Sequence, residues 1–475
     1  MFIDEASHLT RAQWVWEGQP LYLLETGKAL APYLAALFWP FSGEAFLGRY
    51  VVIVLGMVGL AAVYAAGKAL HSREAGLLAM QLWIAAPQLF FYERMALVDT
   101  TIGAMAVLAL WLAARMIRTG SLRTAMLCGA ALALTVLAKL TGIVFAPLAV
   151  LAAILIRSDA PWARCVRAVV MCYLAFAVIL AGPALYILSR GADPTGQSSG
   201  LTSLERASLE ERLAANVDES WEAERIYFSD AMLVALVAGA GLALVFAPRR
   251  ALLLLALAAA PLVAVMVTAQ ALWLRYLAPA TPFILLAAAM GWLEGAAWLA
   301  KWLPRGEVIV RGLPWAGVLL WAITFSLPFI ATAYRDPALL PLAPGDHTEY
   351  IRWVPSGFGR REAAGHIATL AAENGPITVT GVAVNCNAAR LYLPYESPAR
   401  IVCPDLDWGG EKNGPVLALM GEILEREGLI YVLAEDKNPP TVLPAQFPGV
   451  RTEIATFARP TGQYTVRLYE LQPGD

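Results

Sequence analysis

Charged residues are scarce in this sequence. They make up 15% of its 475 residues, whereas apolar residues make up 59%, and the mean hydropathy is +0.59. Because an ordinary soluble protein carries about 25% charged residues, the composition excludes that class and indicates a polytopic membrane protein. The net charge of −2 gives no sign of a nucleic-acid partner.

Cysteine is also rare, and its five copies do not form a disulfide framework. Cys128, Cys165 and Cys172 fall in apolar runs and are typical of small core residues. Cys386 and Cys403 lie in the polar C-terminal part and can pair if that part faces an oxidising compartment. The sequence has no glycine-rich phosphate loop, no HExxH motif and no internal repeat of fixed period, so none of these motifs assigns a function.

Long apolar runs, in contrast, fill the chain from residue 47 to 334. We predict membrane-spanning helices there, because each run approaches the roughly 17–25 residues that cross a bilayer. The ten predicted spans are residues 47–67, 74–92, 99–117, 124–138, 141–156, 166–188, 229–247, 251–269, 276–299 and 313–333. Within residues 1–46, the apolar stretch from Ala29 to Phe41 is broken by Pro32 and too short to span, so we expect a helix at the membrane interface.

Positively charged residues collect in alternate loops. Five loops hold thirteen of them: Lys68 and Arg73; Arg115, Arg118 and Arg123; Arg157, Arg164 and Arg167; Arg249 and Arg250; Lys301, Arg305 and Arg311. The positive-inside rule assigns these loops to the cytoplasmic side of a plasma (inner) membrane. The extracytoplasmic parts are then residues 1–46, the turns 93–98, 139–140 and 270–275, the loop 189–228 and everything after Tyr334. Because an exported N-terminus needs a signal or a span before it, we expect a further span upstream of Met1.

The composition changes at residue 335, where the chain becomes polar and rich in proline. Helical patterns occur at Arg361–Glu373 and Val416–Glu427, and strand patterns at Ile377–Val384, Leu429–Leu433 and Tyr464–Leu471. The predicted fold is therefore an α-helical polytopic membrane protein with a small C-terminal extracytoplasmic α/β domain. Its parts are a first extracytoplasmic loop (1–46), a transmembrane domain (47–334) and the α/β domain (335–475).

Ionisable residues gather at the extracytoplasmic boundary of the predicted spans. They are Asp4, Glu5, His8, Lys28, Glu93, Arg94, Asp99, Lys139 and Arg275, and Tyr276 follows the last of them. The positive-inside rule disfavours cations on this side of the membrane, so we expect these cations to have a role other than setting the topology. A lipid phosphate is a suitable anionic partner, because it lies at headgroup depth and accepts charge-assisted hydrogen bonds from Lys and Arg.

Five short motifs at this boundary occur in a particular order. They are Phe2-x-Asp4-Glu5-Ala6 followed by Lys28-Ala-Leu-Ala-Pro32, then Glu93-Arg94-x-x-x-x-Asp99, Lys139-Leu-Thr-Gly and Arg275-Tyr276-x-x-Pro279. The ordered set resembles integral-membrane glycosyltransferases of the GT-C superfamily, in particular the protein O-mannosyltransferases and the bacterial aminoarabinose-to-lipid-A transferases. The resemblance covers roughly residues 1–335. It departs from the family at Lys28, where a Lys-Pro-Pro motif is usual.

The resemblance implies an enzyme that moves a sugar from a polyprenyl-phosphate-linked donor to a hydroxyl acceptor on a lipid, glycan or protein. It makes Asp4 the general base with Glu5 as its neighbour, and it assigns the donor phosphate to Arg275 and Tyr276, with Lys139 and Lys28. Arg94, Asp99 and His8 would support the site. Because the leaving group is a stable phosphate anion, cations suffice and no general acid is needed; one displacement would invert the anomeric configuration.

Simpler interpretations of the same residues stay open. Asp4 and Glu5 are compatible with a solvated terminal pair, Arg94 and Asp99 with a salt bridge that closes a turn, and Lys139 with a cation that snorkels from a helix end. The resemblance requires no cofactor, although a divalent metal held by Glu5 and His8 is an alternative. At the level of function, the alternatives are a transporter or flippase of a lipid-linked precursor and a membrane scaffold. The span interiors are almost free of charge and show no duplication, which favours the transferase.

Overall fold

The computed structural model describes residues 3–19, 24, 27–38, 46–157, 161–191, 208–269, 272–352, 356–381, 386–394, 396–403, 414–437, 446–462 and 464–474. The chain divides into two compact units. We call Leu21–Ala31 with Tyr50–Ala343 the helical unit, and Met1–Pro20, Pro32–Arg49 and Pro344–Asp475 the α/β unit.

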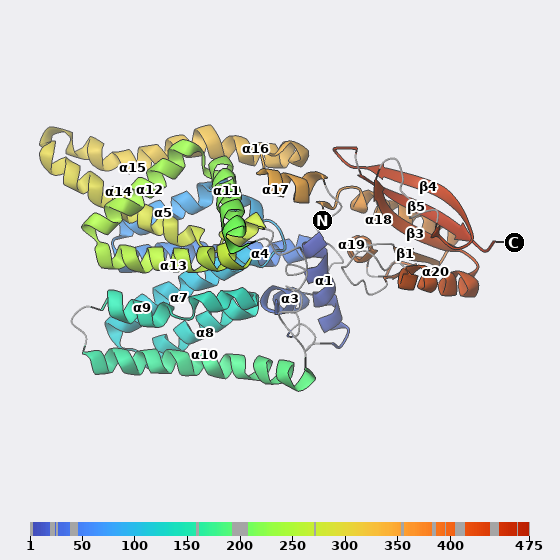
Figure 1. The fold of residues 1–475 in the computed structure, drawn as a ribbon, viewed down its shortest axis with the longest axis horizontal. Coiled ribbons are helices and arrows are strands. Elements are labelled where there is room, and N and C mark those ends of the chain that lie inside the picture. Colours follow the sequence, from blue (N-terminus) through green and yellow to red (C-terminus); the bar gives the residue numbers. More distant parts are fainter. Residues whose placement is uncertain are drawn as a thin grey trace. The chain divides into compact units, whose positions relative to one another are not determined.

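Six helices in the described part of the chain are long and apolar enough to cross a membrane (Figure 1). They are α4 (Phe46–Leu70), α7 (Asp99–Thr119), α10 (Trp162–Arg190), α13 (Pro248–Thr268), α14 (Thr281–Trp302) and the continuous Glu307–Arg335. The last consists of α15 (Glu307–Trp321), one π-helical turn (η5, Ala322–Ser326) and α16 (Leu327–Arg335). These helices confirm the predicted polytopic membrane fold and coincide with six of the ten predicted spans.

Helices also occupy the other four predicted positions, but these are shorter or broken. Residues 74–92 form α5 (Arg73–Ala85) and α6 (Pro87–Tyr92), because the residue before a proline avoids the helical conformation and Ala86 is extended. The remaining three are α8 (Leu122–Ala138), the 3-10 helix η1 (Leu140–Phe145) with α9 (Leu148–Leu155), and α12 (Asp230–Phe246). Counted by length and composition, the described residues hold six spans, or seven if the bent pair of α11 and α12 counts as one.

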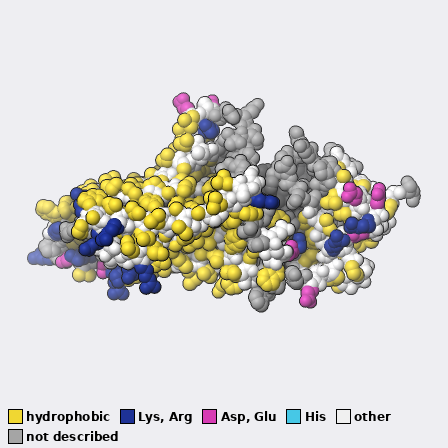
Figure 2. Space-filling view, turned by 90° about the horizontal axis from the view of Figure 1, so that it is seen from below, with side chains coloured by type: hydrophobic (Ala, Val, Ile, Leu, Met, Phe, Trp, Pro, Cys, Tyr) yellow, Lys and Arg dark blue, Asp and Glu magenta, His cyan; other side chains and the backbone are white. Residues whose placement is uncertain are grey.

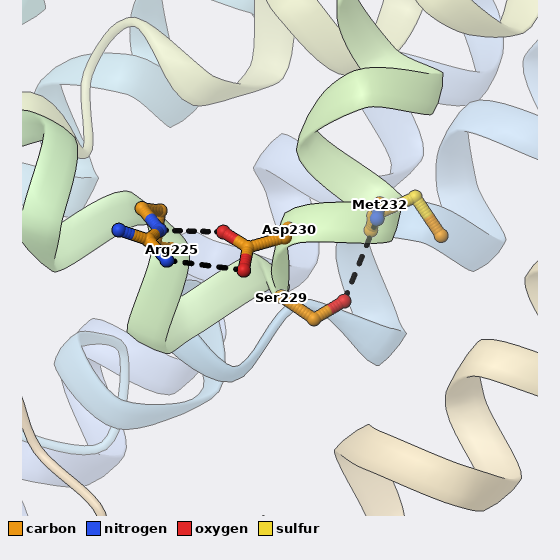
Figure 3. A network of polar contacts seen from close by, with 4 residues as sticks. All are labelled: Arg225, Ser229, Asp230 and Met232. Carbon is orange, nitrogen blue, oxygen red and sulfur yellow. Dashed lines mark hydrogen bonds and ion pairs between the residues drawn. The ribbon is translucent and has the colours of Figure 1, made fainter.

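Helix α11 (Leu209–Phe228) lies within the predicted extracytoplasmic loop 189–228, for which the sequence analysis predicted no helix. A capping box starts it, because Ser208 accepts from the Glu211 backbone and Glu211 accepts from the Ser208 backbone. The chain bends by 104° between α11 and α12. Ser229 occupies the bend with a φ of 62°, and Arg225 and Asp230 face each other across it at 2.5 Å (Figure 3).

The cationic loops of the helical unit lie together. Arg118 donates a hydrogen bond to the carbonyl of Ala69, which joins the first two loops. The side chain of Arg164 lies against Gly120, which joins the second and third. Figure 2 shows Lys and Arg side chains gathered at one end of this unit, beyond a broad apolar surface. This clustering is the arrangement that the alternation of loop charge predicts.

A five-stranded sheet forms the centre of the α/β unit, with strand order β2-β1-β3-β5-β4. Its strands are β1 (Ile377–Gly381), β2 (Ala399–Val402), β3 (Ile430–Lys437), β4 (Val450–Ala458) and β5 (Tyr464–Gln472). β2, β1 and β3 are parallel, whereas β5 pairs antiparallel with β3 and β4. The three predicted strands and both predicted helices, now α18 (Arg360–Asn374) and α20 (Gly414–Glu427), are confirmed. The sequence missed β2 and β4, because β2 has four residues and β4 is mostly exposed at an edge.

Alternate strand residues bury two apolar faces of this sheet. Val379, Leu433 and Val466 pack with Ile367 of α18, whereas Val432 and Leu471 pack with α20. Cys403 is disulfide-bonded, and Cys128, Cys165 and Cys172 are free. The side chain of Cys386, the partner suggested by the sequence, lies outside the described residues.

Residues at the N-terminus also belong to the α/β unit. Ile3–Trp16 form helix α1, which packs against α19 (Cys386–Tyr392), and Arg390 lies 3.1 Å from Glu17. The first part of the predicted extracytoplasmic loop 1–46 is therefore helical. The predicted interfacial helix is the seven-residue α3 (Leu30–Ala36), and residues 39–41 of that prediction lie outside the described part. The remaining short elements are η3 (Leu274–Leu277), η4 (Pro304–Gly306), η6 (Pro337–Leu339), α17 (Pro344–His347) and η7 (Thr348–Arg352).

Candidate functional site

Three ionisable side chains from distant parts of the sequence meet in the helical unit. Asp99 is the first residue of α7, Lys139 caps the C-terminus of α8, and Arg275 lies in the short helix η3. The Lys139 Nζ lies 2.7 Å from Asp99 Oδ1, and the Arg275 Nε lies 3.6 Å from Asp99 Oδ2. One carboxylate therefore bridges two cations, and we call these three residues with Tyr276 the cation cluster.

The cation cluster is almost entirely withdrawn from solvent. The exposed fractions of the side chains are 5% for Asp99, 13% for Lys139 and 7% for Arg275. Aromatic faces support both cations: Lys139 Nζ is 3.8 Å from the ring centroid of Tyr276, and Arg275 Cζ is 5.1 Å from that of Trp273. Lys and Arg side chains placed side by side suit an anionic ligand, because both donate charge-assisted hydrogen bonds to it.

Lys28 lies beside this cluster in the backbone. The amide of Leu140 donates to the carbonyl of Gly27 at 3.0 Å, and the amide of Ala29 donates to the carbonyl of Leu137 at 2.9 Å. Residues 27 and 29, on either side of Lys28, are therefore bonded to residues 140 and 137, which lie on either side of Lys139. The structure thus brings Lys139, Arg275 and Tyr276 together and places the backbone of Lys28 beside that of Lys139.

The packing that fixes the cluster was not predicted. A Cβ added to Gly103 of α7 would lie 3.2 Å from the Cα of Pro279, so glycine permits this close approach. Gly103 follows Asp99 by one helical turn, and Pro279 follows Arg275, which explains how the two charged residues are held together. Trp273 was also missed, although an aromatic residue two positions before Arg275 was a readable signal.

Arg94 does not join the cluster. Its guanidinium lies between the rings of Phe90 and Tyr334, 4.4 and 4.3 Å from their centroids, and it donates to the Tyr334 hydroxyl. The turn-closing salt bridge between Arg94 and Asp99 is therefore wrong, because Lys139 and Arg275 hold Asp99 instead. The Glu93 carboxylate accepts a hydrogen bond of 2.9 Å from Trp83 Nε1 within the helical unit.

Asp4, Glu5 and His8 lie on helix α1 of the α/β unit. Glu5 has no exposed surface, and Arg49 Nε and Nη2 bind its two oxygens at 2.7 and 2.8 Å. Asp4 is half-buried beside it, and His8 is buried with Arg11 Nη1 3.5 Å from its Nδ1. Glu5 is thus part of a bidentate ion pair. Among the residues that the structure describes, no group of three His, Cys, Asp or Glu side chains could hold a metal ion. No third ligand of this kind is therefore described beside Glu5 and His8.

Comparisons with known proteins give a family match and a shared fold. Residues 29–187, which include Asp99 and Lys139, match the profile of the family described as dolichyl-phosphate-mannose-protein mannosyltransferase. No curated protein sequence matches the chain.

Among solved structures, the chain is similar to ArnT from Cupriavidus metallidurans in the apo state, with 15% identity, a TM-score of 0.56 and coverage of 98% of this chain and 93% of ArnT. The same protein bound to undecaprenyl phosphate gives a TM-score of 0.57 at 15% identity, covering 94% and 88%. The archaeal oligosaccharyltransferase AglB from Archaeoglobus fulgidus, in complex with an inhibitory peptide and a dolichol-phosphate, gives 0.51 at 14% identity, covering 92% of this chain and 65% of AglB. The family match within residues 29–187 and a fold shared over nearly the whole chain confirm the resemblance to the GT-C glycosyltransferases that the ordered motifs predicted.

Proposed function

We propose that this protein is a membrane glycosyltransferase that transfers a sugar from a polyprenyl-phosphate-linked donor to a hydroxyl acceptor on the extracytoplasmic face of the plasma (inner) membrane. The observation that carries the proposal is the buried cation cluster, in which Lys139 and Arg275 both lie against the carboxylate of Asp99. ArnT, which shares the fold, has been solved with undecaprenyl phosphate, a ligand of this chemistry.

The cation cluster suits a phosphate that is bound and then released. Arg275 and Lys139 supply charge-assisted donors to its oxygens, and they stay in place as negative charge develops on the departing group. Asp99 keeps the two cations together before the donor arrives, because two buried like charges would otherwise repel each other. Lys28, which is beside Lys139 in the backbone, is the further cation of the proposed phosphate site.

The reaction is one displacement at the anomeric carbon of the donor. The acceptor oxygen forms the new bond to this carbon, its proton passes to the Asp4 carboxylate, and the bond from the anomeric carbon to the phosphate oxygen breaks. The electron pair of that bond leaves with the lipid phosphate, so the anomeric configuration inverts. We assign the base to Asp4 because Asp4 heads the motif that resembles the family, while the Arg49 pair makes Glu5 a residue that anchors α1.

Binding of undecaprenyl phosphate to the purified protein in nanodiscs tests the phosphate site. We expect binding to the parent, a loss of at least tenfold in affinity for Arg275→Ala and Lys139→Ala, and no change for Arg311→Ala, whose side chain is 61% exposed. Undecaprenol, which lacks the phosphate, should bind no more tightly to the parent than to these variants. Equal affinity of parent and Arg275→Ala for undecaprenyl phosphate would contradict the assignment.

A second assay tests transfer. The parent, incubated with polyprenyl-phosphate sugars and membrane lipid extracts, should release free polyprenyl phosphate and a glycosylated product of inverted configuration. Movement of the lipid-linked sugar across a vesicle membrane without release of phosphate would instead support a flippase.

A further inference from the structure

Helix α11 presents a row of polar side chains to the segment that carries Arg275. Asn216, Ser220 and Glu224 are spaced by four residues and therefore lie on one face of the helix. The segment lies between the end of α13 at Thr268 and the start of α14 at Thr281. Helix α11 contacts both α13 and η3.

Asn216 binds the first end of this segment. Its Nδ2 donates to the carbonyl of Ala269 at 2.9 Å and to that of Met266 at 3.1 Å. Carbonyls in the last turn of a helix have no intrahelical partner, so a side-chain donor satisfies them. Asn216 is 3% exposed, and a buried amide that meets two carbonyls fixes where α13 ends.

Gln88 of α6 links Glu224 to the second end of the segment, at Thr281. Its Nε2 donates to Glu224 Oε1 at 2.7 Å, and its Oε1 accepts from the Thr281 hydroxyl at 2.7 Å. A carboxylate only accepts hydrogen bonds, so Glu224 directs the NH₂ group toward itself and the amide oxygen toward Thr281. Because Gln88 is 1% exposed and Thr281 5%, water does not replace these bonds.

We infer that α11 positions Arg275 and Tyr276 by holding both ends of their segment, with Asn216, Glu224 and Gln88 as positioning residues. The inference rests on the proposed function of Arg275. In the described part of this segment, residues 272–280, the regular structure is a four-residue 3-10 helix, which has few hydrogen bonds of its own. Its position relative to Asp99 therefore depends on outside contacts, and a displacement of about 1 Å at a catalytic group costs on the order of 100-fold in rate.

Swapping the two ends of the Gln88–Glu224 hydrogen bond tests the inference. In Gln88→Glu, two carboxylates would face each other in a buried place, so we expect faster amide hydrogen exchange in residues 272–280. In the double variant Gln88→Glu with Glu224→Gln, an amide again donates to a carboxylate, and that carboxylate still accepts from Thr281. Slow exchange should return in the double variant.

Two further variants complete the exchange experiment. Asn216→Ala should also speed exchange in residues 272–280, because it removes the donor at the first end. Glu222→Gln is the matched control, since the same change on the exposed face of α11 should leave exchange as in the parent. Unchanged exchange in both Gln88→Glu and Asn216→Ala, or no recovery in the double variant, would overturn the inference.

Undecaprenyl phosphate binding is the second measurement, and it separates this inference from the proposed function. Gln88→Glu and Asn216→Ala should weaken binding about tenfold while the double variant recovers to within about threefold of the parent. If the parent itself does not bind this lipid, the proposed function fails, whereas the exchange data still decide whether α11 holds the segment. If binding weakens in Gln88→Glu and does not recover in the double variant, the loss reflects general damage and the positioning role is wrong.

Discussion

The charge balance of the cation cluster predicts an unusual response to removal of Asp99. Asp99→Asn keeps the size and most of the hydrogen-bonding shape of the side chain but removes its negative charge. Lys139, 2.7 Å away, and Arg275, 3.6 Å away, would then lie in a buried place without the negative charge that they share in the parent.

The magnitude follows from burial. Removing one partner of a buried ion pair costs about 3–5 kcal/mol. Lys139 keeps the face of Tyr276 and Arg275 that of Trp273, and cation–π contacts retain part of the stabilisation. We therefore expect Asp99→Asn to lower the free energy of unfolding by about 2–4 kcal/mol.

Undecaprenyl phosphate should reverse this loss. In the parent the phosphate competes with the Asp99 carboxylate for the two cations, whereas in Asp99→Asn this competing negative charge is absent. A ligand at 100 times its Kd stabilises the folded state by about 2.7 kcal/mol. The gain in thermal stability on adding this lipid should therefore be larger in Asp99→Asn than in the parent.

Thermal unfolding in nanodiscs, with and without the lipid, measures both effects. Asp230→Asn is the matched control, because Asp230 also pairs with an arginine, at 2.5 Å, but both side chains are exposed. An exposed pair contributes little, so this variant should unfold as the parent does. The reasoning is refuted if Asp99→Asn is as stable as the parent without lipid, or if the lipid stabilises it less than it stabilises the parent.

The other predictions concern the α/β unit. Asp4→Asn should abolish sugar transfer while leaving folding and lipid binding as in the parent; transfer at the parent rate would exclude Asp4 as the base. Glu5→Gln should lower the free energy of unfolding by about 1–3 kcal/mol, because Glu5 is fully buried but Arg49 is 39% exposed. Glu17→Gln, which changes an exposed ion pair, should have little effect on the free energy of unfolding. Equal losses in the two variants would contradict this reasoning. Cys403→Ser should lower Tm and remove one disulfide, measured as one additional thiol that reacts with a maleimide after unfolding, and an unchanged thiol count would contradict the bond.

The sequence alone predicted those features that depend on local pattern. Apolar runs such as residues 99–117 and 251–269 predicted α7 and α13, because a bilayer requires about 20 consecutive apolar residues whatever packs beside them. Strand-like runs likewise predicted β1, β3 and β5, which lie inside the sheet, whereas β4, which is mostly exposed at an edge, was missed. The capping box at Ser208 was a local signal for α11 that the polar composition obscured.

The tertiary structure decided which charges meet. Spacing along the chain placed Arg94 near Asp99, yet packing turned Arg94 between two aromatic rings and brought Lys139 and Arg275 to Asp99. The sequence likewise showed Glu5 as half of an acidic pair, and only the fold gave it Arg49. Such partnerships join residues far apart in the chain, and the side chains that are desolvated together depend on how helices pack rather than on their order.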